Sequence, residues 1–118
     1  MNKTLMARYR EARLKETNAT NEVMKLKGIV ETCDPDDIMK RELVMAEVRE
    51  CDAREDRLKI EKRLDGWIQK QPPLARRALK DIVFDDMTIE AACAKADPRN
   101  VNYTKELVTR LIKEIPVH

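Results

Sequence analysis

Apolar side chains recur at alternating intervals of four and three residues along the first quarter of the chain. The positions are Leu5, Tyr9, Ala12, Glu16, Ala19, Val23, Leu26, Val30 and Cys33. Eight of these nine positions are apolar or semi-apolar, and only Glu16 interrupts them. This alternation is the signature of a coiled-coil seam, because it returns to the same side of a helix after every two turns. The spacing therefore predicts one long helix from about Thr4 to Thr32.

The composition extends the helical prediction to the whole chain. Only two glycines occur in 118 residues, whereas strands joined by tight turns need many more. The most abundant residue types, such as Lys, Arg, Glu, Leu and Ala, are strong helix formers. Aromatic residues make up 3% of the chain and hydrophobic residues 42%, so aliphatic side chains and methionine must build the core. The expected fold class is all-α.

The segment Cys33–Asp37 is expected to end the first long helix and to start a second one. Asp34 can cap the second helix, Pro35 suits its first position, and the two aspartates that follow complement the helix dipole. The helix should continue to about Gln69. Its apolar residues fit one face less cleanly than those of the first helix. They include Ile38, Leu43, Val44, Val48, Cys51, Leu58, Ile60, Leu64, Trp67 and Ile68.

Charge separates the two predicted long helices. Residues 1–27 hold seven basic and three acidic side chains, a net +4, and residues 28–65 hold eight basic and twelve acidic, a net −4. Opposite charges on two helices joined by a short turn predict an antiparallel, coiled-coil-like hairpin over residues 1–70. The alternative is that both helices simply expose solvated outer faces. We expect the hairpin to serve dimerisation or partner contact through Leu5, Tyr9, Ala12, Val23, Leu26 and Val30.

Residues 71–118 are predicted to form a separate small domain of three helices. Gln71-Pro72-Pro73 ends the second long helix, because proline disfavours helical conformation in the residue before it. The pattern then predicts helices over residues 74–84, over residues 89–96 with Thr88 as the cap, and over about residues 102–115. The segment Asp97–Asn100 separates the last two helices.

The last two predicted helices have the pattern of a helix-turn-helix. The first is rich in small residues that permit close approach, and the second bears polar residues early and apolar residues late. One side of the second helix should be exposed, with Asn102, Lys105, Glu106, Thr109, Arg110 and Lys113 on it or beside it. Such side chains hydrogen-bond to base edges and phosphates. Their chemistry suits the major groove of DNA.

The C-terminal half also resembles the C-terminal part (region 4) of a sigma factor. The stretches that carry the resemblance are Ile68–Pro73, Arg76–Leu79, Phe84, Met87–Ala92 and Leu107–Ile115. A helical arm before such a module is similar to phage RinA/ArpU-type late transcriptional activators. The chain departs from the sigma pattern in two places. The link Asp85-Asp86-Met87 lacks a glycine or similar small residue, and the loop Asp97–Val101 is longer.

The resemblance implies a promoter-binding phage regulator, with host RNA polymerase as a candidate partner. It points to DNA contacts by a set of residues around the last helix, to which Lys113 is added by its position. The set is Arg99, Asn102, Tyr103, Lys105, Thr109, Arg110 and Lys113. Arg76 and Arg77 are candidates for phosphate contact, with a purely solvated position as the alternative.

The charge of the C-terminal segment is modest for a DNA-binding domain. Residues 66–118 hold nine basic and seven acidic side chains, a net +2, whereas DNA affinity depends largely on phosphate neutralisation. From residue 99 onward the balance improves, with four basic side chains against two glutamates. A homodimer, which doubles the contacts, is a candidate state.

The sequence lacks the residues of common catalytic and metal sites. His118 is the only histidine, and Cys33, Cys51 and Cys93 are widely spaced with no C-x-x-C pair. We therefore expect no catalytic residue, no metal, no cofactor and no small-molecule substrate, and so no enzyme. No apolar run approaches the ~20 residues that span a bilayer, and no secretion signal is recognised. A cytoplasmic protein without a membrane partner is expected.

Two functional hypotheses follow. The first is a phage-type, sequence-specific regulator of transcription that binds double-stranded DNA through residues 88–115. The second is a small helical protein-interaction module, an adaptor or an inhibitor of a host protein, that acts through its coiled-coil surface. The balanced charge and the heptad spacing favour the second hypothesis, and the polar side of the last helix favours the first.

Overall fold

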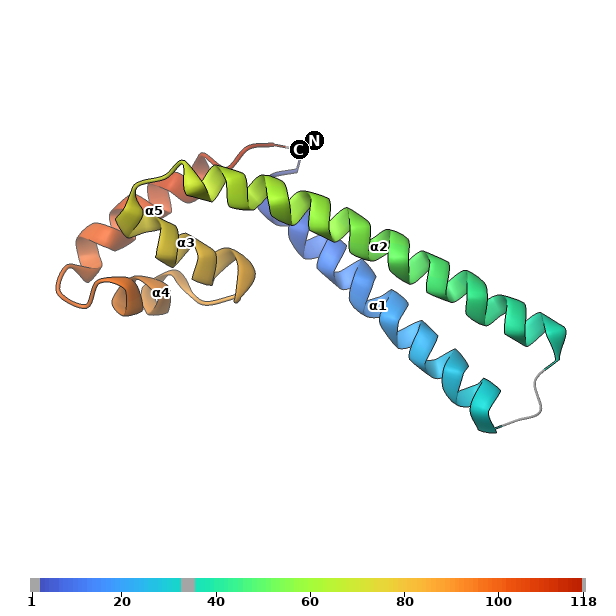
Figure 1. Ribbon diagram of the computed structural model, residues 1–118. Coiled ribbons are helices and arrows are strands. Elements are labelled where there is room, and N and C mark those ends of the chain that lie inside the picture. Colours follow the sequence, from blue (N-terminus) through green and yellow to red (C-terminus); the bar gives the residue numbers. More distant parts are fainter. Residues whose placement is uncertain (1–2, 33–35, 118) are drawn as a thin grey trace. The chain divides into compact units, whose positions relative to one another are not determined.

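The computed structural model describes residues 3–32 and 36–117, and these residues form five α-helices and no strand (Figure 1). The helices are α1 (Leu5–Thr32), α2 (Asp37–Gln69), α3 (Pro73–Phe84), α4 (Ile89–Ala96) and α5 (Val101–Lys113). The all-α prediction is confirmed. No helix in the described part of the chain is both long and apolar enough to cross a membrane.

The chain divides into two compact units. The long-helix unit comprises Ala7–Glu61, and so holds most of α1 and α2. The C-terminal unit combines residues 3–6 with residues 62–117, and so holds the end of α2 with α3, α4 and α5. In that unit the backbone N–H of Leu5 donates to the carbonyl of Pro116 at 2.8 Å, and Thr4 forms a bridge with Val117. The C-terminal unit is therefore built from the first described residues of the chain and from its C-terminal half.

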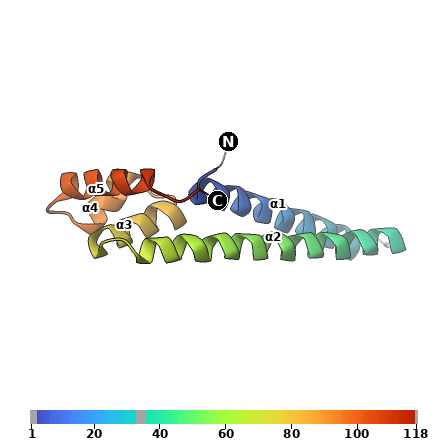
Figure 2. The ribbon, with the colours of Figure 1, turned by 90° about the horizontal axis from the view of Figure 1, so that it is seen from above.

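In the long-helix unit, α1 and α2 lie side by side and run in opposite directions (Figures 1 and 2). Arg49 Nη2 lies 2.9 Å from Glu22 Oε1, and Arg54 Nε lies 3.5 Å from Glu16 Oε1. The earlier residue on α1, Glu16, thus pairs with the later residue on α2, Arg54. Such pairing is the register of two antiparallel helices.

The inner face of α2 also follows an alternation of four and three. Its positions, all buried or half-buried, are Met39, Leu43, Ala46, Glu50, Ala53, Arg57 and Ile60. Two of these residues, Glu50 and Arg57, are charged. The apolar residues of α2 therefore do not define its inner face by themselves, which is why the sequence pattern of this helix looked irregular.

The start of α2 is capped by Asp36. Its Oδ1 accepts a hydrogen bond of 2.8 Å from the backbone N–H of Met39, the arrangement of an N-cap with the third helical residue. The expected cap, Asp34, and the expected first helical residue, Pro35, lie outside the described residues. The helix as described begins at Asp37, and so Asp36 satisfies its first turn.

In the C-terminal unit, α3, α4 and α5 each pack against the other two. Aliphatic and small side chains from four helices build the core, as the scarcity of aromatic residues requires. Its fully buried members include Leu64, Ile68, Ala78, Leu79, Val83, Ala92, Cys93 and Val108. The predicted cap of α4 is confirmed, because Thr88 Oγ1 accepts a hydrogen bond of 3.2 Å from the backbone N–H of Ala91.

Two short connections set the path of these helices. Between α3 and α4, Asp86 has a φ of 55°, a left-handed conformation. The backbone N–H of Met87 then donates to the carbonyl of Asp81 at 3.1 Å. Between α4 and α5 only the four residues Asp97–Asn100 are non-helical, because Val101 already belongs to α5. This connection is shorter than the sequence suggested, and it lies within the three to four residues typical of a helix-turn-helix.

Candidate nucleic-acid interface

Helix α5 has one buried face and one polar face. Thr104, Val108 and Leu111 are buried, and their spacing of four and three residues places them on one side of the helix. That side completes the core formed with α3 and α4. The opposite side of α5 is left to solvent, and this is the side that carries most of the predicted DNA-contacting residues.

Most of the predicted contact residues are exposed. Arg99, Asn102, Arg110 and Lys113 are exposed, and Tyr103 is 64% exposed. Lys105 and Thr109 are half-buried. On α5 the exposed positions 102, 103, 106, 110 and 113 recur at helical spacing and form one continuous polar face, which we call the α5 face. Four of the seven predicted contact residues, Asn102, Tyr103, Arg110 and Lys113, thus lie on the α5 face, together with Glu106. Arg99 precedes α5, and Lys105 and Thr109 lie on α5 but are half-buried.

The basic side chains on and beside the α5 face differ in whether another side chain of the protein already pairs with them. Lys105 Nζ lies 2.8 Å from Glu90 Oε1 at the start of α4. The hydrogen bond from Lys105, and then its charge, lower the pKa of the Glu90 carboxyl, and the pKa of Lys105 is raised in return. No ion pair of Arg99, Arg110 or Lys113 occurs within residues 3–32 and 36–117. Three cations of this surface therefore keep their charge for a ligand, and Lys105 shares its charge with Glu90. The exposed Glu106 adds one negative charge to the α5 face.

The two candidate phosphate ligands on α3 differ. Arg76 is half-buried, and its Nε donates a hydrogen bond of 2.8 Å to the backbone carbonyl of Gln71. This bond closes the connection between α2 and α3, so part of the Arg76 guanidinium already has a structural role. Arg77 is exposed. Of the two, Arg77 keeps the whole of its guanidinium for a phosphate.

The residues proposed as a partner interface on α1 are mostly covered by the chain itself. Leu5, Tyr9, Ala12 and Val23 are buried, and Leu26 and Val30 are half-buried. Within the long-helix unit, from Tyr9 onward, this seam belongs to the face of α1 that lies along α2. A partner surface that is accessible without opening the helix pair must therefore lie elsewhere on α1 and α2.

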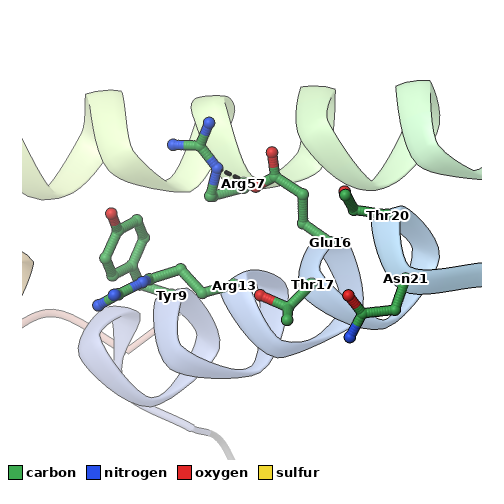
Figure 3. A pocket seen from close by; sticks show the side chains of 7 residues that line it. All are labelled: Tyr9, Arg13, Glu16, Thr17, Thr20, Asn21 and Arg57. Atoms are coloured by element: carbon green, nitrogen blue, oxygen red, sulfur yellow. Dashed lines mark hydrogen bonds and ion pairs between the residues drawn. The ribbon is translucent and has the colours of Figure 1, made fainter. Parts of the chain in front are cut away.

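A polar layer interrupts the seam between α1 and α2, and it explains Glu16. Glu16 Oε2 accepts a hydrogen bond from Arg57 Nε (Figure 3). Arg57 Nη1 also lies 2.6 Å from Glu61 Oε2. The bond to Glu16 is the main cause of the raised pKa of Arg57. The side chains of Glu16 and Arg57 are only 18% and 23% exposed. Sequence reasoning noticed Glu16 as a break but missed its partner, which a search for polar residues at seam spacing on α2 would have found.

Beside this layer the structure has an open groove (Figure 3). It is lined by Tyr9, Arg13, Glu16, Thr17, Thr20, Asn21 and Arg57. The guanidinium of Arg13 lies 5.6 Å from the centre of the Tyr9 ring, and burial, reinforced by the charge of Glu61, raises the pKa of the Tyr9 hydroxyl. The two arginines already have partners on the groove wall, so we assign no ligand to it.

Among the described residues, no group of three or more His, Cys, Asp or Glu side chains is arranged to hold a metal ion. Comparison with known proteins finds no matching family model, no matching curated protein and no matching solved structure. Any functional assignment therefore depends on the chain's own residues.

Proposed function

We propose that the C-terminal unit binds double-stranded DNA through α4 and α5, and that the protein is a phage-type, sequence-specific regulator of transcription. In this proposal α3, α4 and α5 form a helix-turn-helix module, and α5 enters the major groove. Helices α1 and α2 form a helical hairpin that serves dimerisation or contact with host RNA polymerase.

The observation that carries the proposal is the α5 face together with Arg99, which lies just before α5. Arg99, Arg110 and Lys113 are exposed and without an ion-pair partner among the described residues. Asn102 and Tyr103 lie among them and are exposed as well. Cations neutralise phosphates and asparagine can pair with adenine in the major groove. A solvent-exposed helix with this side-chain chemistry, packed against α3 and α4, suits direct readout of DNA.

Two local features agree with the sigma-like resemblance. The four-residue connection Asp97–Asn100 is short enough for a helix-turn-helix. The left-handed φ of Asp86 lies in the α3–α4 link, where the sigma pattern usually has a glycine or small residue. The absence of a glycine in the α3–α4 link and the length of the α4–α5 connection are therefore both compatible with the proposed module.

Fluorescence anisotropy with a labelled random-sequence duplex tests the proposal. We expect a Kd of roughly 10⁻⁴ to 10⁻⁶ M at physiological salt. Arg110→Ala combined with Lys113→Ala should weaken binding by at least about tenfold, because two charge-assisted contacts are lost. The matched control is Lys25→Ala with Lys27→Ala, two exposed lysines of α1, which should leave the affinity nearly unchanged. Equal affinities for both double variants would reject the α5 face.

Sequence specificity needs a separate measurement. Selection of bound duplexes from a random library should enrich one motif for the wild-type protein and lose that motif with Asn102→Ala. Enrichment of no motif would leave a general DNA-binding protein and would reject the specific regulator.

A second candidate function is a helical protein-interaction module. It is favoured by the outer surface of α2, which holds five of the nine large exposed hydrophobic side chains in the described chain. If this is the function, the protein shows no DNA binding at low salt, where a phosphate-binding protein binds most tightly.

A further inference from the structure

The outer face of α2 carries its own alternation of four and three residues, and we infer that this face joins two copies of the chain in an antiparallel dimer. This outer seam consists of Arg41, Val44, Val48, Cys51, Glu55 and Leu58, all of them exposed. It lies on the side of α2 away from the inner positions that pack along α1. The inference does not depend on DNA binding, because every seam residue belongs to the long-helix unit.

The apolar content of the outer seam is unusual for a helix facing water. Val44, Val48 and Leu58 are 58%, 47% and 48% exposed, and Met45 beside them is 55% exposed. Helix α1 has only two large exposed apolar side chains, Leu14 and Met24. Exposed apolar side chains that line up along one helix mark a surface that another helix covers.

The charges beside the outer seam identify the covering helix. If Val48 and Cys51 occupy the two core positions of a heptad, Glu47 and Arg54 occupy equivalent flanking positions seven residues apart. An antiparallel pair that sets Val48 opposite Cys51 of the second copy also sets Glu47 opposite Arg54 of that copy. In the same pairing, Lys40 of one copy comes opposite Glu61 of the other. The two-fold axis repeats each contact, so the pairing gives four contacts between opposite charges.

The other arrangements of the same two helices bring like charges together. A parallel pair sets Glu47 opposite Asp52 and Arg54 opposite Lys59, and it sets Glu55 opposite its own copy. A shift of the antiparallel pair by one heptad in one direction brings Arg54 against Arg54, and in the other direction it brings Glu47 against Glu47. Flanking charges decide orientation and register in coiled coils. Of these arrangements, only the antiparallel register that sets Val48 opposite Cys51 pairs these flanking charges with opposite charges.

The flanking side chains are accessible for this role. Glu47 and Lys40 are exposed. Arg54 is 47% exposed, and its contacts with Glu16 and Glu50 are long, at 3.5 and 3.7 Å. Its guanidinium can therefore reach a second copy without breaking a tight internal pair. Glu61 is held by Arg57, so the Glu47–Arg54 contacts are the stronger determinants.

Sedimentation equilibrium of the full chain under reducing conditions tests the inference. The wild-type protein should associate reversibly to a dimer. Glu47→Arg should weaken this dimer by about tenfold, because two attractive contacts become repulsive. Glu42→Arg makes the same charge change at an exposed position of α2 outside the seam, and it should leave the dimer unchanged. A parallel pair predicts the opposite sign for Glu47→Arg, since position 47 would then face Asp52.

Mixing two variants gives the sharpest outcome. Glu47→Arg and Arg54→Glu should each dimerise weakly alone, and together they should form a heterodimer in which every flanking pair is attractive. Arg54→Glu also faces Glu16, so circular dichroism must first show an unchanged helix content. If it does not, Val48→Asp provides the test, because this exposed substitution should abolish the dimer. A wild-type protein that stays monomeric, or a dimer that tolerates Val48→Asp, overturns the inference.

Discussion

Asp86 holds the turn between α3 and α4 in a conformation that residues with a side chain rarely adopt. Its φ of 55° lies in the left-handed region. This conformation is unfavourable by about 1–2 kcal/mol for an ordinary L residue and by less for aspartate or asparagine. Glycine adopts this conformation without that cost. Aspartate at position 86 is therefore less favourable for this turn than glycine would be.

Paired substitutions measure this cost. Asp86→Gly should be more stable than Asp86→Ala by about 1 kcal/mol, because both remove the side chain and only alanine is strained at positive φ. Asp85 is the matched control, since its φ is −106°. There the glycine variant should not be the more stable one. The measurement is the free energy of unfolding from urea titration, and equal differences at the two positions would contradict a left-handed turn.

Glu90 limits the charge that the α5 face presents. It is exposed and holds Lys105 Nζ at 2.8 Å. Glu90→Gln should therefore raise the affinity for a random duplex several-fold, because Lys105 becomes free for phosphate and one repulsive charge disappears. Glu42→Gln on α2 is the control with the same charge change. An affinity that does not respond to Glu90→Gln, or that falls, would place the DNA elsewhere.

At the scale of helices, the seam between α1 and α2 combines aliphatic layers with one polar layer. The Glu16–Arg57 pair sets the register. One seam position further, three residues forward on α1 and four residues back on α2, Ala19 comes opposite Ala53, a layer of two small residues that permits close approach. The polar layer stabilises little by itself, because desolvation offsets much of the attraction between half-buried charges. It specifies which residues of the two helices face each other.

Removing one partner of this layer should cost more than removing both. Arg57→Ala should lower the free energy of unfolding by about 1–3 kcal/mol, because Glu16 is left largely covered and without its main partner. Glu16→Leu combined with Arg57→Leu should recover most of that loss. The control is Arg49→Ala, whose pair with Glu22 is about half exposed and should contribute less than about 1 kcal/mol. A double variant as unstable as Arg57→Ala would contradict this account of the layer.

The helices could be predicted from the sequence because local signals mark them. Pro72 and Pro73 end α2, Thr88 caps α4, and the spacing from Leu5 to Val30 predicts α1. The inner face of α2 could not be predicted from apolar residues, since Glu50 and Arg57 occupy two of its positions. The pairing of Lys105 with Glu90 was also beyond the sequence, because it depends on how α4 and α5 pack. Exposure on the α5 face followed from the helical spacing alone.

At the scale of the whole chain, the two compact units divide the proposed tasks. The C-terminal unit presents the α5 face, and the long-helix unit presents the outer seam of α2. A dimer doubles the number of phosphate contacts available to one assembly, which would offset the modest net charge of +2 on the chain. The two proposals stand separately, because Glu47→Arg alters only a charge beside the outer seam, and Arg110→Ala with Lys113→Ala alters only the α5 face.

The salt dependence of DNA binding tests the central claim most directly. Each phosphate contact contributes a slope of about −0.9 to a plot of log K against log salt concentration. With Arg99, Arg110 and Lys113 in contact, a single C-terminal unit should give a slope of about −3, and Arg110→Ala with Lys113→Ala should reduce its magnitude by about 2. A slope near zero, or the same slope in the double variant, would contradict DNA binding through α5.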